Sequence, residues 1–248
     1  MNSISNDLLQ SVTQVTGHLA EVRDRVQRAL IEADREPGET AILSVSKQQP
    51  AAAIEALFQA GQVDFGENFL QEAMEKITEL EHLKIDWHFI GRIQSNKTRE
   101  IAERFQWVHT IDRMKIATRL NEQRPHNSKP LDVCVQVDQA GEPQKGGIAP
   151  AGVANLARGI MELPRLRLRG LMTIPPATKD PTESAPFFAE LRRQKERLES
   201  EGIPMDTLSM GMSSDLEIAI REGSTIVRIG TAIFGRRPPK TGTGAPHT

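Results

Sequence analysis

Two turns near the C-terminal end of the chain are built from small residues that suit a bound anion. Residues 209–215 have the sequence SMGMSSD, and residues 227–235 have the sequence VRIGTAIFG. Each segment follows an apolar run and ends in a turn where backbone N–H groups can approach a phosphate closely. We therefore expect Ser213, Gly230 and Thr231 to contribute to a phosphate site.

A lysine ends another apolar run, far upstream, in the sequence Val45-Ser46-Lys47. If this run is a strand, Leu43, Val45 and Lys47 share one face of it. An amine in partly apolar surroundings loses some of its preference for being charged, so it becomes a usable nucleophile. A phosphate site and such a lysine together suggest a site for pyridoxal 5'-phosphate (PLP), with Lys47 forming a Schiff base with the aldehyde. Taken by itself, Lys47 also fits a surface residue at a strand end.

Three more polar residues lie within or soon after predicted strands. Arg228 lies two residues before Gly230, so it faces the same side as the phosphate site. Arginine keeps its protons, so it can donate to a ring nitrogen but cannot accept from it; a structural ion pair is the alternative. Asn68 and His88 are candidates for bonding to a phenolic oxygen of the cofactor or packing beside its ring. Each fits a helix cap or a loop hydrogen bond equally well.

The elements that must position these residues follow an alternating pattern. Apolar residues spaced three and four apart predict one long helix over residues 4–34. Short β-branched runs then predict eight strands, at residues 41–46, 63–66, 87–91, 107–111, 132–137, 166–174, 207–211 and 225–234. Helices are predicted between them, at residues 50–60, 68–81, 96–104, 113–123, 149–161, 181–200 and 214–222, with caps at Asn68, Asn96 and Ser214.

Eight strands that alternate with helices predict parallel βαβ units, in a closed barrel or an open, doubly wound sheet. The number of strands and the absence of a Gly-x-Gly-x-x-Gly after the first one favour closure. We expect an α/β fold, a single (β/α)8 TIM-type barrel with an extra N-terminal helix, over residues 1–237. In such barrels phosphate commonly binds at the loops after strands seven and eight, where the two turns fall. The Pro-, Gly- and Thr-rich tail, residues 238–248, is expected to be disordered.

The composition indicates an ordinary globular protein and excludes several classes of partner. The chain has 248 residues and a net charge of −2, which makes no electrostatic case for nucleic acid or an anionic membrane. The one cysteine, Cys134, rules out an internal disulfide, is expected to be buried, and fits a reducing compartment. No signal peptide is recognisable, and no apolar run approaches the roughly 20 residues that span a bilayer. We expect a cytoplasmic protein without a metal site.

The pieces described so far resemble the pyridoxal phosphate homeostasis protein family, whose fold is similar to the barrel domain of alanine racemase. The resemblance covers residues 39–237. Its most specific pieces are residues 208–215 and 227–235. The others are Val45-Ser46-Lys47, Phe65-Gly66-Glu67-Asn68, His88-Phe89-Ile90-Gly91-Arg92-Ile93-Gln94-Ser95-Asn96-Lys97, Lys145-Gly146-Gly147 and Gly170-Leu171-Met172-Thr173-Ile174.

The resemblance implies a role for each candidate residue. Lys47 would be the Schiff-base lysine, Arg228 would face the pyridine nitrogen, and Asn68 would line the ring. The phosphate would be bound by Ser213, Gly230 and Thr231. The chain departs from the family's usual pattern in the loop at residues 137–142, where Asn and Ser are more common, and this leaves the cofactor site untouched.

Two classes of function follow from a PLP barrel. An amino-acid racemase needs two bases, and alanine racemases of this fold take one of them, a tyrosine, from a second domain. This chain has no tyrosine. We therefore expect a PLP-binding protein of intracellular PLP homeostasis or delivery, without robust racemase activity, monomeric, with apo PLP-dependent enzymes as partners. The alternatives are a PLP-dependent racemase or decarboxylase and a barrel enzyme acting on a phosphorylated metabolite.

Overall fold

The computed structural model describes residues 2–235, and their side chains from Val12 onward. Eight strands alternate with helices along this part of the chain. The strands are β1 (Ala41–Val45), β2 (Asp64–Glu67), β3 (Asp86–Phe89), β4 (Trp107–Ile111), β5 (Leu131–Val137), β6 (Leu166–Thr173), β7 (Thr207–Ser209) and β8 (Ile226–Ile229). The α-helices are α1 (Asn2–Glu32), α2 (Ala51–Gln59), α3 (Leu70–Glu79), α4 (Thr98–Arg104), α5 (Met114–Gln123), α6 (Val153–Met161), α7 (Ala185–Ser200), α8 (Leu216–Arg221) and α9 (Thr231–Phe234).

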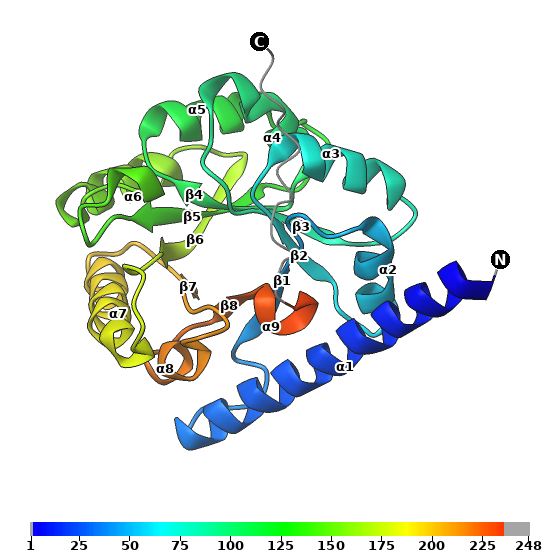
Figure 1. The fold of residues 1–248 in the computed structure, drawn as a ribbon. Helices are drawn as coiled ribbons and strands as arrows, with labels where there is room; N and C mark the ends of the chain where they lie inside the picture. The colour runs from blue at the N-terminus through cyan, green and yellow to red at the C-terminus, as the bar shows by residue number, and fades with distance from the viewer. Residues whose placement is uncertain (1, 236–248) are drawn as a thin grey trace, which may run out of the picture.

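The eight strands form one closed barrel in which each strand pairs in parallel with its neighbours in the sequence. The barrel closes where β1 pairs with β8, which sets Leu43 opposite Arg228. Figure 1 shows the strands at the centre and the helices around them. The prediction of a (β/α)8 barrel is therefore confirmed, and the doubly wound alternative is wrong.

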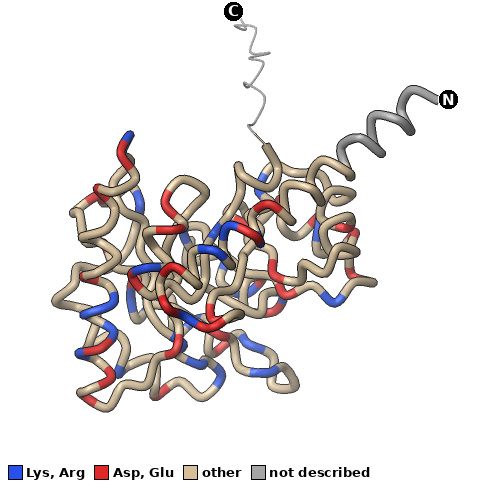
Figure 2. Tube along the Cα trace, turned by 90° about the horizontal axis from the view of Figure 1, so that it is seen from below, with Lys and Arg blue, Asp and Glu red and all other residues tan. Residues whose placement is uncertain are grey.

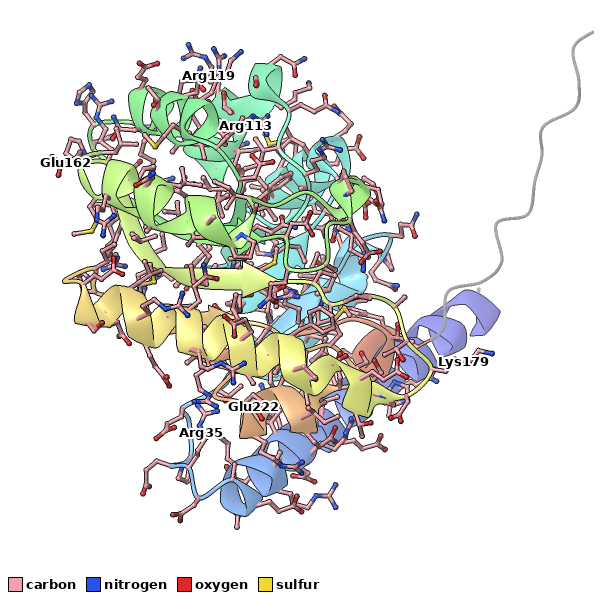
Figure 3. All side chains as sticks on the ribbon, turned by 90° about the vertical axis from the view of Figure 1, so that its left-hand side faces the viewer. Arg35, Arg113, Arg119, Glu162, Lys179 and Glu222 are labelled. Carbon is pink, nitrogen blue, oxygen red and sulfur yellow. The ribbon has the colours of Figure 1, made fainter. Side chains whose placement is uncertain are left out.

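Helix α1 is the predicted extra element, and it packs along the outside of the barrel against α2, α8 and α9 (Figure 1). Its buried side chains recur at spacings of three and four residues, as in Leu19, Val22 and Val26. After α1 the chain is tied to the end of α8, because Nη1 of Arg35 donates to the carbonyl oxygens of Ile220 and Ser224, both at 2.8 Å. Figure 3 shows Arg35 beside α8.

The core has two parts, one on each side of the barrel wall. The larger part fills the layer between strands and helices and includes every second residue of β5, from Leu131 to Val137. The smaller part lies inside the barrel and contains Leu43, Val45, Ile90 and Ile226. Much of the remaining interior is polar and includes the buried side chains of His88, His109 and Arg228.

The last predicted strand is wrong in its second half. The strand prediction covered residues 225–234, but β8 ends at Ile229, and Thr231–Phe234 form the short helix α9. The reason is local: Gly230 has φ −109° and ψ −74°, which is helical rather than extended backbone. Similarly, β7 stops at Ser209, and Gly211 beyond it has φ +94°, which a strand does not use.

The three predicted helix caps are also wrong. Helices α3, α4 and α8 each begin two residues later than expected, so the cap positions are occupied by Phe69, Lys97 and Asp215, without a side-chain hydrogen bond that caps the helix. Asn96 lies inside a 3-10 turn, Ser95–Lys97. Boundary shifts of this size are common because helix ends fray and tighten.

Charges of both signs are mixed along the described part of the chain (Figure 2). None of its helices is long and apolar enough to cross a membrane. The tail predicted to be disordered, residues 238–248, lies outside the described residues.

Candidate functional site

One cavity, of about 520 Å³, opens at the carboxyl ends of the strands. Six of the candidate residues from the sequence line it: Lys47, Asn68, Ser213, Arg228, Gly230 and Thr231. They come from the ends of β1, β2, β7 and β8 and from the start of α9. Its apolar wall consists of residues that sequence reasoning did not assign to the site, namely Val45, Ile90, Met172, Ile174 and Met212. The volume is in the ordinary range for a small-molecule site.

Lys47 follows β1 on the side facing the barrel axis, as strand alternation predicted. Leu43 and Val45 belong to the apolar cluster inside the barrel, and Lys47 lines the cavity just beyond them. A hydrogen bond from a lysine of α3 holds the backbone next to Lys47: Nζ of Lys76 donates to the carbonyl oxygen of Ser46 at 2.7 Å. The next residue, Gln48, has φ +61° and donates its N–H to Glu72.

A buried ion pair supports this turn, and sequence reasoning missed it. Glu67, at the end of β2, accepts from Nζ of Lys76 at 2.8 Å and from Oγ of Ser46 at 2.7 Å. Burial raises the pKa of the Glu67 carboxyl, and the attraction of Lys76 offsets this only in part. Removing one member of such a pair leaves the other charge buried and uncompensated, which is strongly destabilising. The cluster thus fixes the position from which Lys47 enters the cavity.

The two C-terminal turns meet at one side of the cavity. Ser213 follows β7, while Gly230 and Thr231 connect β8 to α9. The two turns are bonded to each other, because the N–H of Ala232 donates to Oγ of Ser213 at 3.2 Å. A short helix that follows strand eight and begins at residues lining the cavity is the phosphate-binding arrangement typical of this barrel.

Arg228 is 5% exposed and reaches the cavity from inside the barrel. Its guanidinium donates to neutral oxygens: Nη1 to the carbonyl and hydroxyl oxygens of Ser209, at 2.6 and 2.9 Å, and Nη2 to the carbonyl oxygen of Thr173 at 2.8 Å. Burial lowers the pKa of Arg228 to about 10, with attraction by Asp215 acting in the opposite direction. The group therefore remains charged near neutral pH, and the ion pair considered from the sequence is not formed within hydrogen-bond distance among the described residues.

Asn68 lies in the turn between β2 and α3, where the chain passes close to Gly91. Its Oδ1 is buried, and no group among the described residues donates to it. A buried acceptor without a donor costs about 1–3 kcal/mol, so an atom of this kind on a cavity wall suits a donor from a ligand. The close passage requires glycine at position 91, because an added Cβ would overlap the backbone carbonyl of Asn68.

His88, the other candidate for a contact with the ring, is absent from the wall of this cavity. It lies inside the barrel, 2% exposed, and bonds to Asp64 and His109. Cys134 is fully buried, as expected, and burial raises the pKa of its thiol. The described residues contain no group of three or more His, Cys, Asp or Glu side chains that could hold a metal ion.

The sequence is similar to known proteins over nearly its whole length. The sequence model of the family "Alanine racemase, N-terminal domain" matches residues 18–238. The pyridoxal phosphate homeostasis protein of Pseudomonas aeruginosa is 52% identical over 226 residues, which are 91% of this chain and 97% of that protein. The pyridoxal phosphate homeostasis protein of Escherichia coli K12 is 46% identical over 229 residues, 91% of this chain and 98% of that protein.

Among solved structures, PipY of Synechococcus elongatus PCC7942 is similar in both sequence and fold. Its structure without PLP has a TM-score of 0.80 and 36% identity, and the match covers 90% of this chain and all of PipY. PipY has also been solved with PLP bound, and that structure has a TM-score of 0.79 and 35% identity over the same share of both chains.

Proposed function

The chain belongs to the pyridoxal phosphate homeostasis protein family, and from this premise we propose that it binds PLP through Lys47 and acts in PLP homeostasis or delivery, without robust racemase activity. One observation carries the proposal: a single cavity contains a lysine at the end of β1, an arginine from β8 and the two C-terminal turns. A relative that has been solved with PLP bound supports the choice of ligand.

The residues present fit the parts of PLP. Lys47 offers an amine for a Schiff base with the aldehyde. Ser213, Gly230 and Thr231 offer a hydroxyl and the N–H groups of a helix start for the phosphate. Arg228 can only donate, so it suits an unprotonated ring nitrogen. The undonated Oδ1 of Asn68 fits a polar contact at the edge of the ring.

The same residues argue against an efficient racemase. Bound PLP supplies an electron sink for amino-acid chemistry, and its capacity is greatest when the ring nitrogen is protonated. Arg228, charged at neutral pH, favours the unprotonated nitrogen. A racemase also needs a second base, and the tyrosine that the alanine racemase fold uses is missing, because the sequence contains no tyrosine.

Delivery predicts that PLP passes from this protein to an apo PLP-dependent enzyme. The rim of the cavity includes Met212, which is 37% exposed, so the site has an open side from which PLP can leave. We expect an apo-enzyme to recover activity faster with the PLP-loaded protein than with an equal amount of free PLP, when a PLP-scavenging enzyme removes whatever is released. Equal recovery in the two samples would contradict direct transfer.

A racemase assay on the loaded protein separates this proposal from its main alternative. We expect L-alanine to show no racemisation above that caused by free PLP. A turnover in the usual enzyme range, roughly 1–1,000 per second, would show that the protein is a racemase instead.

We also propose that the protein acts as a monomer in the cytoplasm. The barrel closes within one chain, so its core needs no partner to be complete. The single buried cysteine fits a reducing compartment. Light scattering during size-exclusion chromatography should give the mass of one 27.5 kDa chain, and the mass of a dimer would contradict this part of the proposal.

A further inference from the structure

A line of hydrogen-bonded side chains occupies the inside of the barrel and ends at the cavity. Oδ1 of Asp64 lies 3.2 Å from Nε2 of His88, and Nδ1 of His88 lies 2.9 Å from Nε2 of His109. Nδ1 of His109 lies 2.7 Å from Oγ of Ser209, which accepts from Nη1 of Arg228 at 2.9 Å. The five residues come from five different strands, β2, β3, β4, β7 and β8.

Both ends of this line allow hydrogen bonds in one direction only. A guanidinium only donates, so Ser209 Oγ accepts from Arg228 and turns its own proton to Nδ1 of His109. With Nδ1 as an acceptor, a neutral His109 carries its proton on Nε2 and donates to Nδ1 of His88. His88 in turn carries its proton on Nε2 and donates to the carboxylate of Asp64, which only accepts. Every link then has one donor and one acceptor, with both imidazoles neutral.

The opposite direction of hydrogen bonding leaves groups at both ends of the line without a suitable partner. With protons on Nδ1 of both histidines, Nε2 of His88 would face Asp64 as acceptor against acceptor. At the far end the hydroxyl of Ser209 would accept from His109, and its proton would have no acceptor among its neighbours in the line. A buried polar group without a partner costs about 1–3 kcal/mol, so the first direction is favoured.

The surroundings of His109 keep its imidazole neutral. Burial lowers the pKa of His109 well below its usual value, and the positive charge of Arg228 acts in the same direction. The ring of His88 stacks on Trp107, with centroids 5.3 Å apart and planes 4° apart. On the same indole lies the guanidinium of Arg169, 4.6 Å from the ring centroid. Asp64, with a side chain 29% exposed, is the end of the line that meets solvent.

We propose that His88, His109 and Ser209 are positioning residues that aim the guanidinium of Arg228 at the cavity, with Asp64 setting the direction of their protons. The inference rests on the proposed function, in which Arg228 faces the ring nitrogen of PLP. Among the described residues, only neutral oxygens lie within hydrogen-bond distance of the guanidinium, and one of them is the hydroxyl of Ser209, the last link of the line. This hydroxyl accepts from Arg228 while its own proton goes to Nδ1 of His109, so the line fixes the orientation of the hydroxyl that holds the guanidinium.

The first test measures where the protons are, without any cofactor. Long-range proton–nitrogen spectra of the full chain labelled with nitrogen-15 histidine distinguish the two neutral tautomers. We expect both His88 and His109 to carry a proton on Nε2 and none on Nδ1. In Asp64→Asn, which removes the charge and offers a donor as well as an acceptor, part of the His109 signal should shift to the Nδ1–H form. The matched control is Asp206→Asn, an exposed carboxylate bonded to Arg169, which should leave both tautomers unchanged. A proton on Nδ1 of His109 in the unsubstituted protein would overturn the proposal.

The second test asks whether the line acts through Arg228. Ser209→Ala removes the last link and keeps the backbone carbonyl that Arg228 also uses. We expect this variant to bind PLP about tenfold more weakly, the effect of one hydrogen bond. It should bind the 1-deaza analogue of PLP, in which carbon replaces the ring nitrogen, as the unsubstituted protein does. Equal losses for both ligands would show a merely structural role and overturn the proposal. If the unsubstituted protein binds neither PLP nor its 1-deaza analogue, the proposed function fails. The tautomers of His88 and His109 still show in that case whether the protons of the line point in the proposed direction.

Discussion

The variant Lys47→Ala is expected to fold like the unsubstituted protein and to form no PLP adduct that borohydride can fix. Lys47 is half-buried at the end of β1 and lies outside both apolar clusters, so its removal opens no cavity in the core. The turn around it is held by the buried group of Ser46, Glu67 and Lys76, which the substitution leaves intact. The phosphate contacts proposed for the C-terminal turns also remain.

PLP binding should therefore be weak and reversible in Lys47→Ala rather than lost. We expect the affinity to fall by roughly 100-fold, which corresponds to about 2.7 kcal/mol of binding free energy. Equilibrium dialysis gives the affinity, circular dichroism checks the fold, and the intact mass after borohydride reduction shows whether an adduct forms.

Two lysines provide matched controls for Lys47→Ala. Lys145 is engaged with Glu142 and the carbonyl oxygen of Pro175, at 2.6 and 2.7 Å, and Lys97 lines a neighbouring cavity. Lys145→Ala and Lys97→Ala should keep the reducible adduct. An adduct that persists in Lys47→Ala and disappears in one of these two would show that the linkage is at that lysine.

Gly91→Ala is expected to destabilise the fold and to disturb the cavity together. A Cβ at position 91 would overlap the backbone of Asn68, coming within 2.7 Å of its carbonyl carbon. A backbone atom cannot move aside as a flexible side chain does, so the turn after β2 must shift and carry Asn68 with it. We expect a loss of about 3 kcal/mol in the free energy of unfolding, the upper part of the usual range for overpacking.

Urea unfolding followed by circular dichroism measures this loss, and PLP titration measures the damage to the site. Gly17→Ala is the matched control: Gly17 lies in α1, and apart from the neighbouring backbone of the helix itself no atom of the described residues lies within 4 Å of the added Cβ. That variant should be as stable as the unsubstituted protein or more stable by about 0.5–1 kcal/mol, because alanine favours a helix. An unchanged urea midpoint in Gly91→Ala would contradict the close approach of Asn68.

Strand alternation was sufficient to predict from the sequence on which side of β1 and β8 the residues of this cavity lie. Lys47 was expected on the same face as Leu43 and Val45, and those two residues do form part of the cluster inside the barrel. Arg228 was expected on the same side as the phosphate site, and its side chain lines the cavity. Such predictions succeed because a strand has a period of two, so the position of one residue decides that of its neighbours.

The parts that were not predicted depend on contacts across the barrel. His109 and Ser209 are 100 residues apart in the sequence and are bonded only because the barrel closes. No periodicity relates them, and in the sequence each is an ordinary polar residue in a short strand. His88 was considered as a contact of the cofactor for the same reason: its strand was predicted, but its depth inside the barrel was not. The helix at Thr231–Phe234 was missed because its apolar residues suit a strand equally well, and the backbone of Gly230 decides between the two.

The most direct test of the account is to add PLP to the full-length protein, reduce it with borohydride and map the modified peptide by mass spectrometry. The account predicts a visible absorption band that disappears on reduction, and a single modified peptide in which the adduct is on Lys47. Absence of both the band and the adduct at saturating PLP, or an adduct on a different lysine, would contradict the assignment of this cavity as a PLP site built around Lys47.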